Sequence, residues 1–265
     1  MTLVAITGDH PRHAYLVQRL AKTGLLTAWI RERREAFLPV APAGLRPDTS
    51  RLFDLHFARR EEAEEHIFGR PDMSGIRIHD TTQEDLNGDA VVQLLRETAP
   101  RLVLSYGCHK LSAALRAAVP ATFWNTHGGL SPDYRGVITH FWPSYMLEPQ
   151  MTGVTLHQTT DSLDAGAVLH QSGAVLNRGD GVHMLAARTV KAYADELPEL
   201  LPTALAQDQL PEGQRQKSAG KLWLSSDWRP EHLHLVYDTW GDRIVDRVLD
   251  GDIAGRDPKL FSCLG

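Results

Sequence analysis

Residues 125–136 read NTHGGLSPDYRG, and the rest of the chain is organised around this stretch. The apolar residues 121–124 before it predict a strand that runs directly into a loop rich in glycine and proline. In open α/β sheets, strand ends that lead into such loops are where ligands bind. Asn125 and His127 are two positions apart, so an extended backbone would project both side chains from one face. An amide that can donate to an oxyanion would then lie beside an imidazole that can move protons near neutral pH.

A second block, GVTLHQTTDSLDAG, covers residues 153–166 and supplies a carboxylate, Asp164. An amide, an imidazole and a carboxylate together would make an acyl-transfer site. Taken singly, each residue also has an ordinary structural explanation. Asn125 could cap a turn, His127 could be a buried histidine with satisfied hydrogen bonds, and Asp164 could be a turn residue. Their joint occurrence in two ordered blocks favours catalysis.

The two blocks resemble the folate-dependent formyltransferases, a family that includes the glycinamide ribonucleotide, methionyl-tRNA and sugar-amine N-formyltransferases. Its signature is Asn-x-His, two small residues, Leu, a Pro and a Tyr/Phe-Arg/Lys-Gly step, followed by Gly-Val-Thr and Asp-Ala/Thr-Gly. Gly128 and Gly129 stand in place of the usual Pro-Ser, which leaves the three polar residues intact and widens the loop. The resemblance implies an α/β fold with a Rossmann-like, open and mostly parallel sheet and flanking helices. We expect a catalytic domain over 1–205 and a small C-terminal appendage over 206–265.

The resemblance also implies a site. Asn125, His127 and Asp164 would be the catalytic residues, and N10-formyltetrahydrofolate would be the formyl donor. The segment that follows the strand at 101–106 would lie beside the pterin of the folate, largely through backbone groups, with the loop 159–165 opposite. The donor-binding residues expected on this basis are Tyr106, Gly107, Cys108, His109, Lys110, Leu111, Thr160, Asp161 and Leu163. We interpret Cys108 as a packing residue rather than a nucleophile, because no base is paired with it.

Formyl transfer to an amine needs a neutral attacking nitrogen, a stabilised oxyanion and a route for the proton to the departing N10. Asn125 suits the oxyanion. His127 would take the amine proton if neutral or share the oxyanion if protonated, and the sequence leaves both open. Asp164 would orient His127 or stabilise its charge. No serine or cysteine is activated, so we expect direct attack, and the reaction requires no metal.

The first predicted turn, residues 7–13, offers candidates for acceptor binding. It lacks the Gly-x-Gly-x-x-Gly fingerprint, so we predict no nicotinamide site. Where the purine-pathway members have a glycine-rich phosphate turn, this chain has His10, Arg12 and His13 at the start of a helix. Arg12 and His13 are expected to bind the acceptor, unless they are simply solvated. His157 is a further candidate at the edge of the site, with packing within the strand as the alternative.

Composition limits the partners. The chain has 265 residues, a formal charge of −5 and a pI near 6.2, so there is no basic field to hold a nucleic acid. Two cysteines are too few for a disulfide scaffold. The N-terminus lacks the pattern of a signal peptide, and no apolar run approaches the roughly 20 residues of a membrane span. We therefore expect a soluble, cytoplasmic protein without a membrane partner, and leave a homodimer open.

Periodicity predicts strands at 3–6, 26–30, 76–78, 101–106, 121–124, 153–158 and 167–171. It predicts helices after residue 13, at 50–68, 90–97, from 113 to 118 and from Asp180 onward, and smaller β and helical segments at 220–224 and 243–249. Asp180 is expected to cap its helix, and Pro198 and Pro202 to limit the helix end. The prolines at 39, 42 and 47 argue against a helix before residue 50.

The leading functional hypothesis is an N-formyltransferase acting on the amine of a small molecule, with a nucleotide-linked amino sugar as first choice. The acidic charge disfavours methionyl-tRNA, and the altered first turn disfavours glycinamide ribonucleotide. Two alternatives stay open: a formyltetrahydrofolate hydrolase and a non-catalytic folate-binding protein. The hydrolases usually carry an extra N-terminal domain, whereas this chain begins with its first strand. The complete Asn, His and Asp set argues against simple binding.

Overall fold

A seven-stranded sheet forms the centre of the computed structural model, which describes residues 2–33, 39–218 and 220–264. The strand order is β3-β2-β1-β4-β5-β7-β8. The strands from β1 to β5 run parallel, and β7 and β8 continue the sheet antiparallel, which confirms the expected open, mostly parallel α/β sheet. The strands are β1 (Leu3–Thr7), β2 (Leu26–Glu32), β3 (Ile78–Thr81), β4 (Leu102–Tyr106), β5 (Thr122–His127), β7 (Gly153–Gln158) and β8 (Val168–Gly173).

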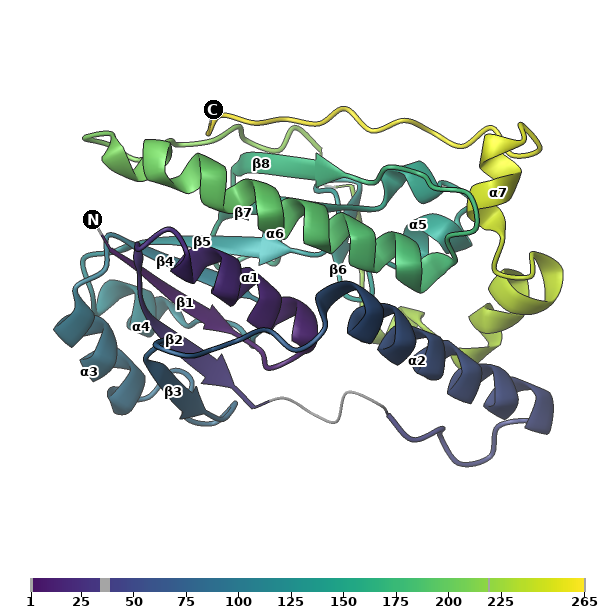
Figure 1. Ribbon diagram of the computed structural model, residues 1–265, viewed down its shortest axis with the longest axis horizontal. Helices are drawn as coiled ribbons and strands as arrows, with labels where there is room; N and C mark the ends of the chain where they lie inside the picture. The colour runs from purple at the N-terminus through teal and green to yellow at the C-terminus, as the bar shows by residue number, and fades with distance from the viewer. Residues whose placement is uncertain (1, 34–38, 219, 265) are drawn as a thin grey trace.

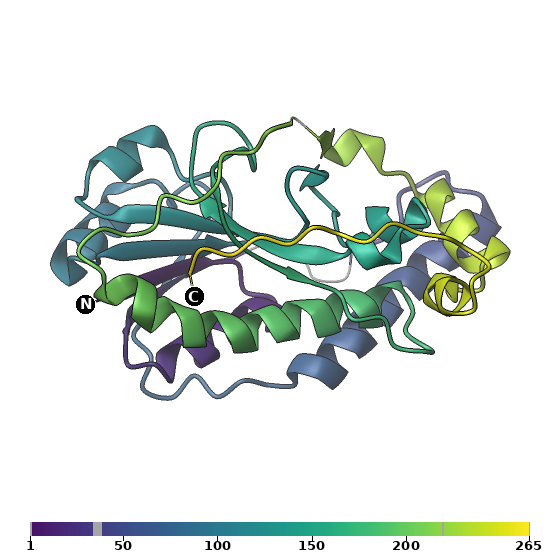
Figure 2. The same cartoon turned by 90° about the horizontal axis from the view of Figure 1, so that it is seen from above.

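Helices cover both faces of the sheet. On one face lie α1 (Pro11–Ala21), α6 (Val182–Ala206) and the inner part of α2 (Pro47–Phe68), and on the other lie α3 (Asp89–Thr98) and α4 (Ala113–Ala117) (Figures 1 and 2). Strands β1 and β4 are buried along their whole length, as expected for apolar runs inside a doubly covered sheet. Two separate apolar clusters fill the space between the sheet and its helical layers.

The strand order changes direction between β1 and β4, so the loops that follow these two strands lie side by side. The Gly8 amide donates to the Tyr106 carbonyl across this junction, with a nitrogen–oxygen distance of 3.2 Å. Crevices at such positions are where open α/β sheets bind their ligands. The predicted acceptor turn and the predicted donor segment therefore meet at the C-terminal edge of the sheet.

The C-terminal part of the chain packs against helix α2 and against the loop that follows β5. Strand β9 (Lys221–Trp223) pairs in parallel with β6 (Tyr134–Gly136). Trp223 stacks on Trp142 of the short helix α5 (Trp142–Tyr145), with ring centroids 4.1 Å apart. The remaining elements are the helix α7 (Ile244–Leu249), the π-helix η4 (Leu235–Thr239) and the 3₁₀ helices η1 (Pro149–Met151), η2 (Ser225–Asp227) and η3 (Pro230–His232). The domain boundary at residue 206 stays a prediction.

Two C-terminal segments border the outer side of β8. Gln214 and Ser262 form isolated bridges with Val168 and His170, and the Cys263 amide donates to the Leu169 carbonyl at 2.9 Å. In Figure 1 the final yellow stretch returns along the top of the molecule and ends near the start of β8. Ser262 and Cys263 therefore cover part of the β8 edge of the sheet.

Four local expectations were wrong. The third strand covers Ile78–Thr81 rather than 76–78. Helix α2 begins at Pro47 rather than after residue 50, because proline at the first helical position has no amide to lose. Helix α6 continues through Pro198 and Pro202 to Ala206, because its buried side chains hold it against the sheet. Asp180 does not cap that helix. The N-cap is Gly181, and the first helical amide, of Val182, instead donates to Asp242 Oδ1 at 2.9 Å.

In the described part of the chain, no helix has both the length and the apolar character that a membrane crossing would need.

Candidate active site

Strand pairing brings Asn125 and His157 together. Strand β5 carries Asn125 to the C-terminal edge of the sheet, and β7 runs antiparallel beside it with Asn125 opposite His157. Two residues later β5 ends at His127, so both side chains leave the strand on the same face, as the spacing predicted. The antiparallel register therefore delivers a second histidine to the site from a distant part of the sequence.

The Asn125 amide is held at both ends. Ser105 Oγ donates to Asn125 Oδ1 at 2.8 Å. The Asn125 Nδ2 lies 3.2 Å from His157 Nε2. His157 Nδ1 lies 2.8 Å from the Gln158 carbonyl, which can only accept, so Nδ1 carries the proton and Nε2 accepts from Asn125. One of the two Asn125 N–H groups is thereby used, and the second is left for another acceptor.

His127 is buried, and its ring has a defined orientation. Its Nε2 donates to the Tyr134 carbonyl at 2.8 Å. In the neutral ring, Nδ1 is then an unprotonated base, and it lies 3.4 Å from Asp164 Oδ2. Burial lowers the pKa of His127, although the nearby Asp164 carboxylate and the Tyr134 carbonyl oppose this shift. The neutral imidazole is therefore favoured at physiological pH.

Asp164 lies between the two histidines. Its Oδ2 accepts from the Gly136 amide at 2.9 Å, and its Oδ1 lies 3.4 Å from His157 Nε2. Burial alone would raise the pKa of Asp164, but the Gly136 amide and the charge that the His127 and His157 rings carry when protonated outweigh it and lower that pKa. The residue has a left-handed φ of 47°, a conformation that aspartate tolerates better than most residues. An ionised carboxylate thus faces both rings.

The Arg135-Gly136 step of the first motif helps to hold the Asp164 carboxylate in place. Gly136 has a φ of 96°, and a Cβ there would lie 2.0 Å from the Trp223 carbonyl oxygen. Only glycine fits this position, and its amide is the one that holds Asp164. From the C-terminal side, Gln216 Nε2 donates to the Asp164 carbonyl at 2.8 Å. Asp164 is therefore positioned by two segments distant from it in sequence.

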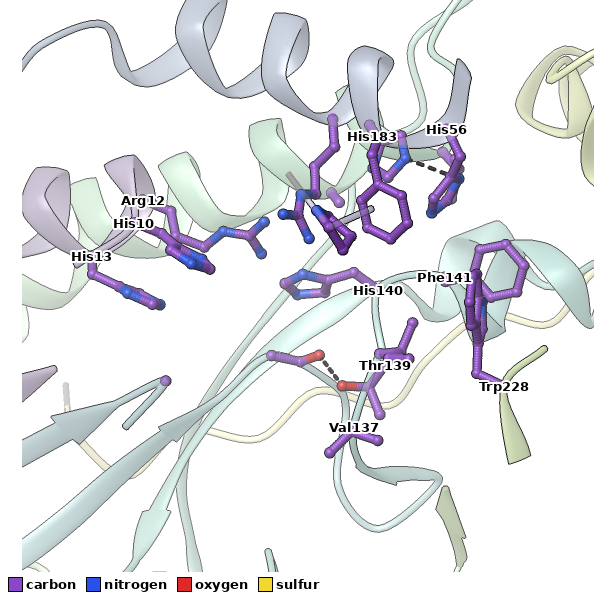
Figure 3. A pocket seen from close by; sticks show the side chains of 18 of the residues that line it. His10, Arg12, His13, His56, Val137, Thr139, His140, Phe141, His183 and Trp228 are labelled. Carbon is purple, nitrogen blue, oxygen red and sulfur yellow. Dashed lines mark hydrogen bonds between the residues drawn. The ribbon is translucent and has the colours of Figure 1, made fainter. Parts of the chain in front are cut away.

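A cavity of about 560 Å³ opens beside this network, bordered by Gly107 and by Gly128, the residue after His127. Its walls combine aromatic rings with nitrogen-bearing side chains and include no carboxylate among the described residues. Figure 3 shows Arg12, His10 and His13 at one end, His140 in the middle, and Phe141 and Trp228 at the other end. Its volume and apolar lining suit a small-molecule ligand.

Arg12 and His13, which were expected to bind the formyl acceptor, both line the cavity but have different surroundings. Arg12 forms an ion pair with the buried Glu64 of α2. Burial opposes the charge of Arg12, yet Glu64 and Tyr106 outweigh it and raise the pKa of Arg12. The His13 ring is packed edge-on to Tyr106, with centroids 4.6 Å apart. Arg12 therefore presents a permanent charge to the cavity, whereas His13 is mainly enclosed.

The two expected donor-binding segments are tied together. Lys110 Nζ donates to the Asp161 carbonyl at 2.7 Å, and Arg116 forms an ion pair with the Asp161 carboxylate. Glu32 at the end of β2 accepts from the His109 amide at 2.8 Å and lies 2.6 Å from His109 Nδ1. Within these segments Tyr106 and Leu111 are buried, Leu163 is exposed, and Thr160, Gly107 and Cys108 lie on the loops. The two segments are therefore held next to each other by the contacts of Lys110 and Arg116 with Asp161.

No group of three or more side chains suited to holding a metal ion occurs among the residues the structure describes.

Comparison with known proteins agrees with this architecture. Residues 27–201 match the model of a family described as formyl transferase. The chain belongs to the formyl transferase family. This match covers β2 to most of α6 and therefore includes both sequence blocks.

Solved structures of formyltransferases share the fold. A phosphoribosylglycinamide formyltransferase from Anaplasma phagocytophilum is 20% identical, with a TM-score of 0.56 over 84% of this chain and 98% of that one. A sugar N-formyltransferase from a Shewanella species is 18% identical, with a TM-score of 0.54 over 86% and 78%. An N-formyltransferase from Helicobacter canadensis, in complex with folinic acid and dTDP-3-aminofucose, is 16% identical, with a TM-score of 0.53 over 86% and 73%.

Several residues of this formyltransferase site could not be found from the sequence. Ser105 lies inside a predicted strand, and its contact with Asn125 depends on the pairing of β4 with β5. Gln216 and Trp228 come from the expected appendage, where no motif marks them. Arg60 lies on the helix predicted at 50–68, where no motif marks it, yet it lines the cavity. The recognisable signals were confined to the two sequence blocks, 125–136 and 153–166.

Proposed function

We propose that this formyltransferase moves a formyl group from N10-formyltetrahydrofolate to a primary amine of a small molecule. The observation that carries the proposal is the connected set of Asn125, His157, Asp164 and His127 beside the cavity. One amide donor remains for a developing oxyanion, and one neutral imidazole is backed by a carboxylate. These are the groups that direct acyl transfer to an amine requires.

In the proposed reaction, the neutral amine attacks the formyl carbon, and a carbon–nitrogen bond forms as the carbonyl π bond becomes an oxyanion. The second N–H of Asn125 stabilises this oxyanion. The new nitrogen then bears an extra proton, which His127 Nδ1 takes directly or through water. The imidazolium is stabilised by Asp164, at 3.4 Å, and by the Tyr134 carbonyl. The carbon–N10 bond breaks as the proton passes to N10, which regenerates neutral His127.

The donor is assigned to the segments 106–111 and 159–165. Segment 106–111 follows β4 at the C-terminal edge of the sheet, whereas 159–165 follows the antiparallel β7, whose end lies opposite Trp124, and folds back. Lys110 connects the two segments through the Asp161 carbonyl. The backbone groups of these loops suit the polar edge of a pterin, which carries several donors and acceptors. The relative from Helicobacter canadensis holds folinic acid, which supports a folate donor for this chain.

The acceptor is assigned to the cavity, with a nucleotide-linked amino sugar as the first choice. Arg12 and Arg60 line it, and no described carboxylate does. Burial and the charge of Arg12 lower the pKa of Arg60 to about 10, despite the opposing effect of Glu64. An anionic group in the cavity would relieve this repulsion, and arginines bind phosphates well. The dTDP-3-aminofucose held by one relative supports this class of acceptor.

Product analysis tests the function. The protein would be incubated with N10-formyltetrahydrofolate and a panel of dTDP-, GDP- and UDP-linked amino sugars, and the products identified by mass spectrometry. We expect formylated amine and free tetrahydrofolate in equal amounts. Tetrahydrofolate and formate without any amine product would indicate a hydrolase. Folate binding without turnover of any substrate would indicate a binding protein, and both results would contradict the proposal.

A further inference from the structure

The histidine at position 140 lies against the loop that replaces the usual Pro-Ser of the family. A Cβ at Gly128 would come within 3.0 Å of His140 Cε1 and 3.2 Å of His140 Nε2. The Gly128 carbonyl also accepts from Thr139 Oγ1. The glycine therefore leaves the space that the His140 ring occupies, directly after the catalytic His127.

One hydrogen bond defines the His140 ring. Its Nε2 lies 3.2 Å from the Gly153 carbonyl, which only accepts, so Nε2 carries the proton. Burial, the charge of Arg12 and the neighbouring His127 lower the pKa of His140 to about 3, although the Gly153 carbonyl opposes them. The ring is therefore neutral at physiological pH, and its Nδ1 is a lone-pair acceptor. Among the residues that the structure describes, none donates to this Nδ1.

His140 lies between the two ends of the cavity. Its ring extends into the cavity between the group formed by Arg12 and His10 and the aromatic end formed by Phe141 and Trp228 (Figure 3). The cavity offers many donors, from arginines and histidines, whereas Nδ1 of His140 can only accept. A neutral amine has N–H groups to donate and a lone pair that must point at the formyl carbon. An acceptor atom beside Gly128 would fix that orientation.

We propose that His140 Nδ1 accepts a hydrogen bond from the amine of the acceptor. This bond makes the part of the cavity beside Gly128 selective for an amine. This assignment rests on the proposed function and adds an amine-binding residue to it. The Gly128-Gly129 pair is then the sequence change that makes room for it. At Gly129 a Cβ would come within 2.6 Å of His127 Nε2, so a larger residue there would also displace the catalytic ring.

Two substitutions separate hydrogen bonding from packing. His140→Leu removes Nδ1 and keeps apolar bulk, whereas His140→Asn can place Oδ1 near the position of Nδ1. Both lose the bond to the Gly153 carbonyl that Nε2 makes, so this loss cancels in their comparison. With dTDP-3-aminofucose and the rest of the amino-sugar panel, we expect His140→Leu to raise the acceptor KM at least tenfold. We expect His140→Asn to stay within about threefold of the wild type, and the donor KM to remain unchanged in both.

A double-mutant cycle provides a second measurement. Gly128→Ala should push the ring aside in the wild type and raise the acceptor KM severalfold. In the His140→Asn background the Cε1 and Nε2 atoms that the new methyl group meets no longer exist, so Gly128→Ala should have a smaller effect.

The outcomes distinguish this inference from the function on which it rests. If the wild type formylates an amine but His140→Leu and His140→Asn have equal acceptor KM values, the role of His140 is refuted alone. The same holds if Gly128→Ala acts equally in both backgrounds. If the wild type formylates no amine of the panel, the proposed function and this inference are both refuted.

Discussion

The Asn125 amide nitrogen lies 3.2 Å from His157 Nε2, and this contact determines which way round the amide is held. His157 is itself oriented by the Gln158 carbonyl, at 2.8 Å from its Nδ1. In the proposed mechanism, His157 therefore decides whether the Asn125 amide presents its donor or its acceptor to the oxyanion.

Asn125 and His157 should differ in the size of their effect. Asn125→Ala removes the oxyanion donor, and we expect kcat to fall by about 10²–10³. His157→Ala leaves the amide held by Ser105 alone, and we expect a fall of roughly tenfold because the amide can then rotate. Steady-state kinetics on variants with wild-type circular dichroism would measure both. A larger loss for His157→Ala than for Asn125→Ala would assign the chemistry to His157 instead.

His127 and Asp164 should act as a pair. We expect His127→Ala and Asp164→Asn each to reduce kcat by at least about 10², with little change in the KM of the donor. The double variant should be scarcely worse than either single one, because both changes disable the same proton transfer. Near-normal turnover in a folded single variant would remove that residue from the mechanism.

The pH dependence follows from the lowered pKa of His127. In the proposed reaction the neutral ring takes the amine proton, so kcat/KM should fall as the pH drops through the folded-state pKa, and this acid limb should lie below 6.5. Asp164→Asn removes the charge that stabilises the imidazolium, so the residual activity should show the limb at still lower pH. Profiles measured between about pH 5 and 8 would show this. Activity that instead falls as the pH rises through this range would indicate that the protonated ring is the active form.

His56 should make the fold sensitive to acid. Burial and the charge of Arg60 lower its pKa from 6.5 to about 3. Between these values the unfolded chain binds a proton that the folded chain does not, so stability is lost as the pH falls below 6.5. The expected slope is about 1.4 kcal/mol per pH unit from this group. Urea unfolding of His56→Phe should show a shallower slope than the wild type, whereas His66→Phe, exposed on the same helix, should match it.

Arg12 requires a paired change to test its role in binding. Removing it alone would leave Glu64 buried without its partner and destabilise the fold. In Arg12→Ala/Glu64→Gln we expect the acceptor KM to rise about tenfold, equivalent to about 1.4 kcal/mol, with the donor KM unchanged. Arg19 lies on the same helix as Arg12 and forms a 2.8 Å ion pair with Asp195 of α6, so Arg19→Ala serves as the control. A shift in the donor KM instead would place the anion site elsewhere.

Local pattern predicted the sheet and the strand that carries Asn125 and His127, because apolar runs and turn residues act over a few positions. It failed where tertiary packing overrides local preference, as at Pro198 inside α6. The Asn-x-His and Asp-Ala-Gly steps indicated the three central residues through a family resemblance. Ser105 and Gln216 could not be predicted, since their contacts arise from strand pairing and from the return of the C-terminal chain. Arg60 could not be assigned to the cavity either, because the periodicity of a helix does not reveal a cavity beside it.

The chain end that borders β8 has a consequence for how the protein behaves in concentrated solution. An uncovered edge strand presents a row of peptide groups that can template strand addition from another molecule. Here Gln214 and Cys263 already occupy bonding positions along Val168 and Leu169. A chain shortened by its last few residues would still contain every residue assigned to chemistry, but it would expose part of this row. We therefore expect such a shortened protein to aggregate through the exposed strand edge rather than to turn over its substrate more slowly.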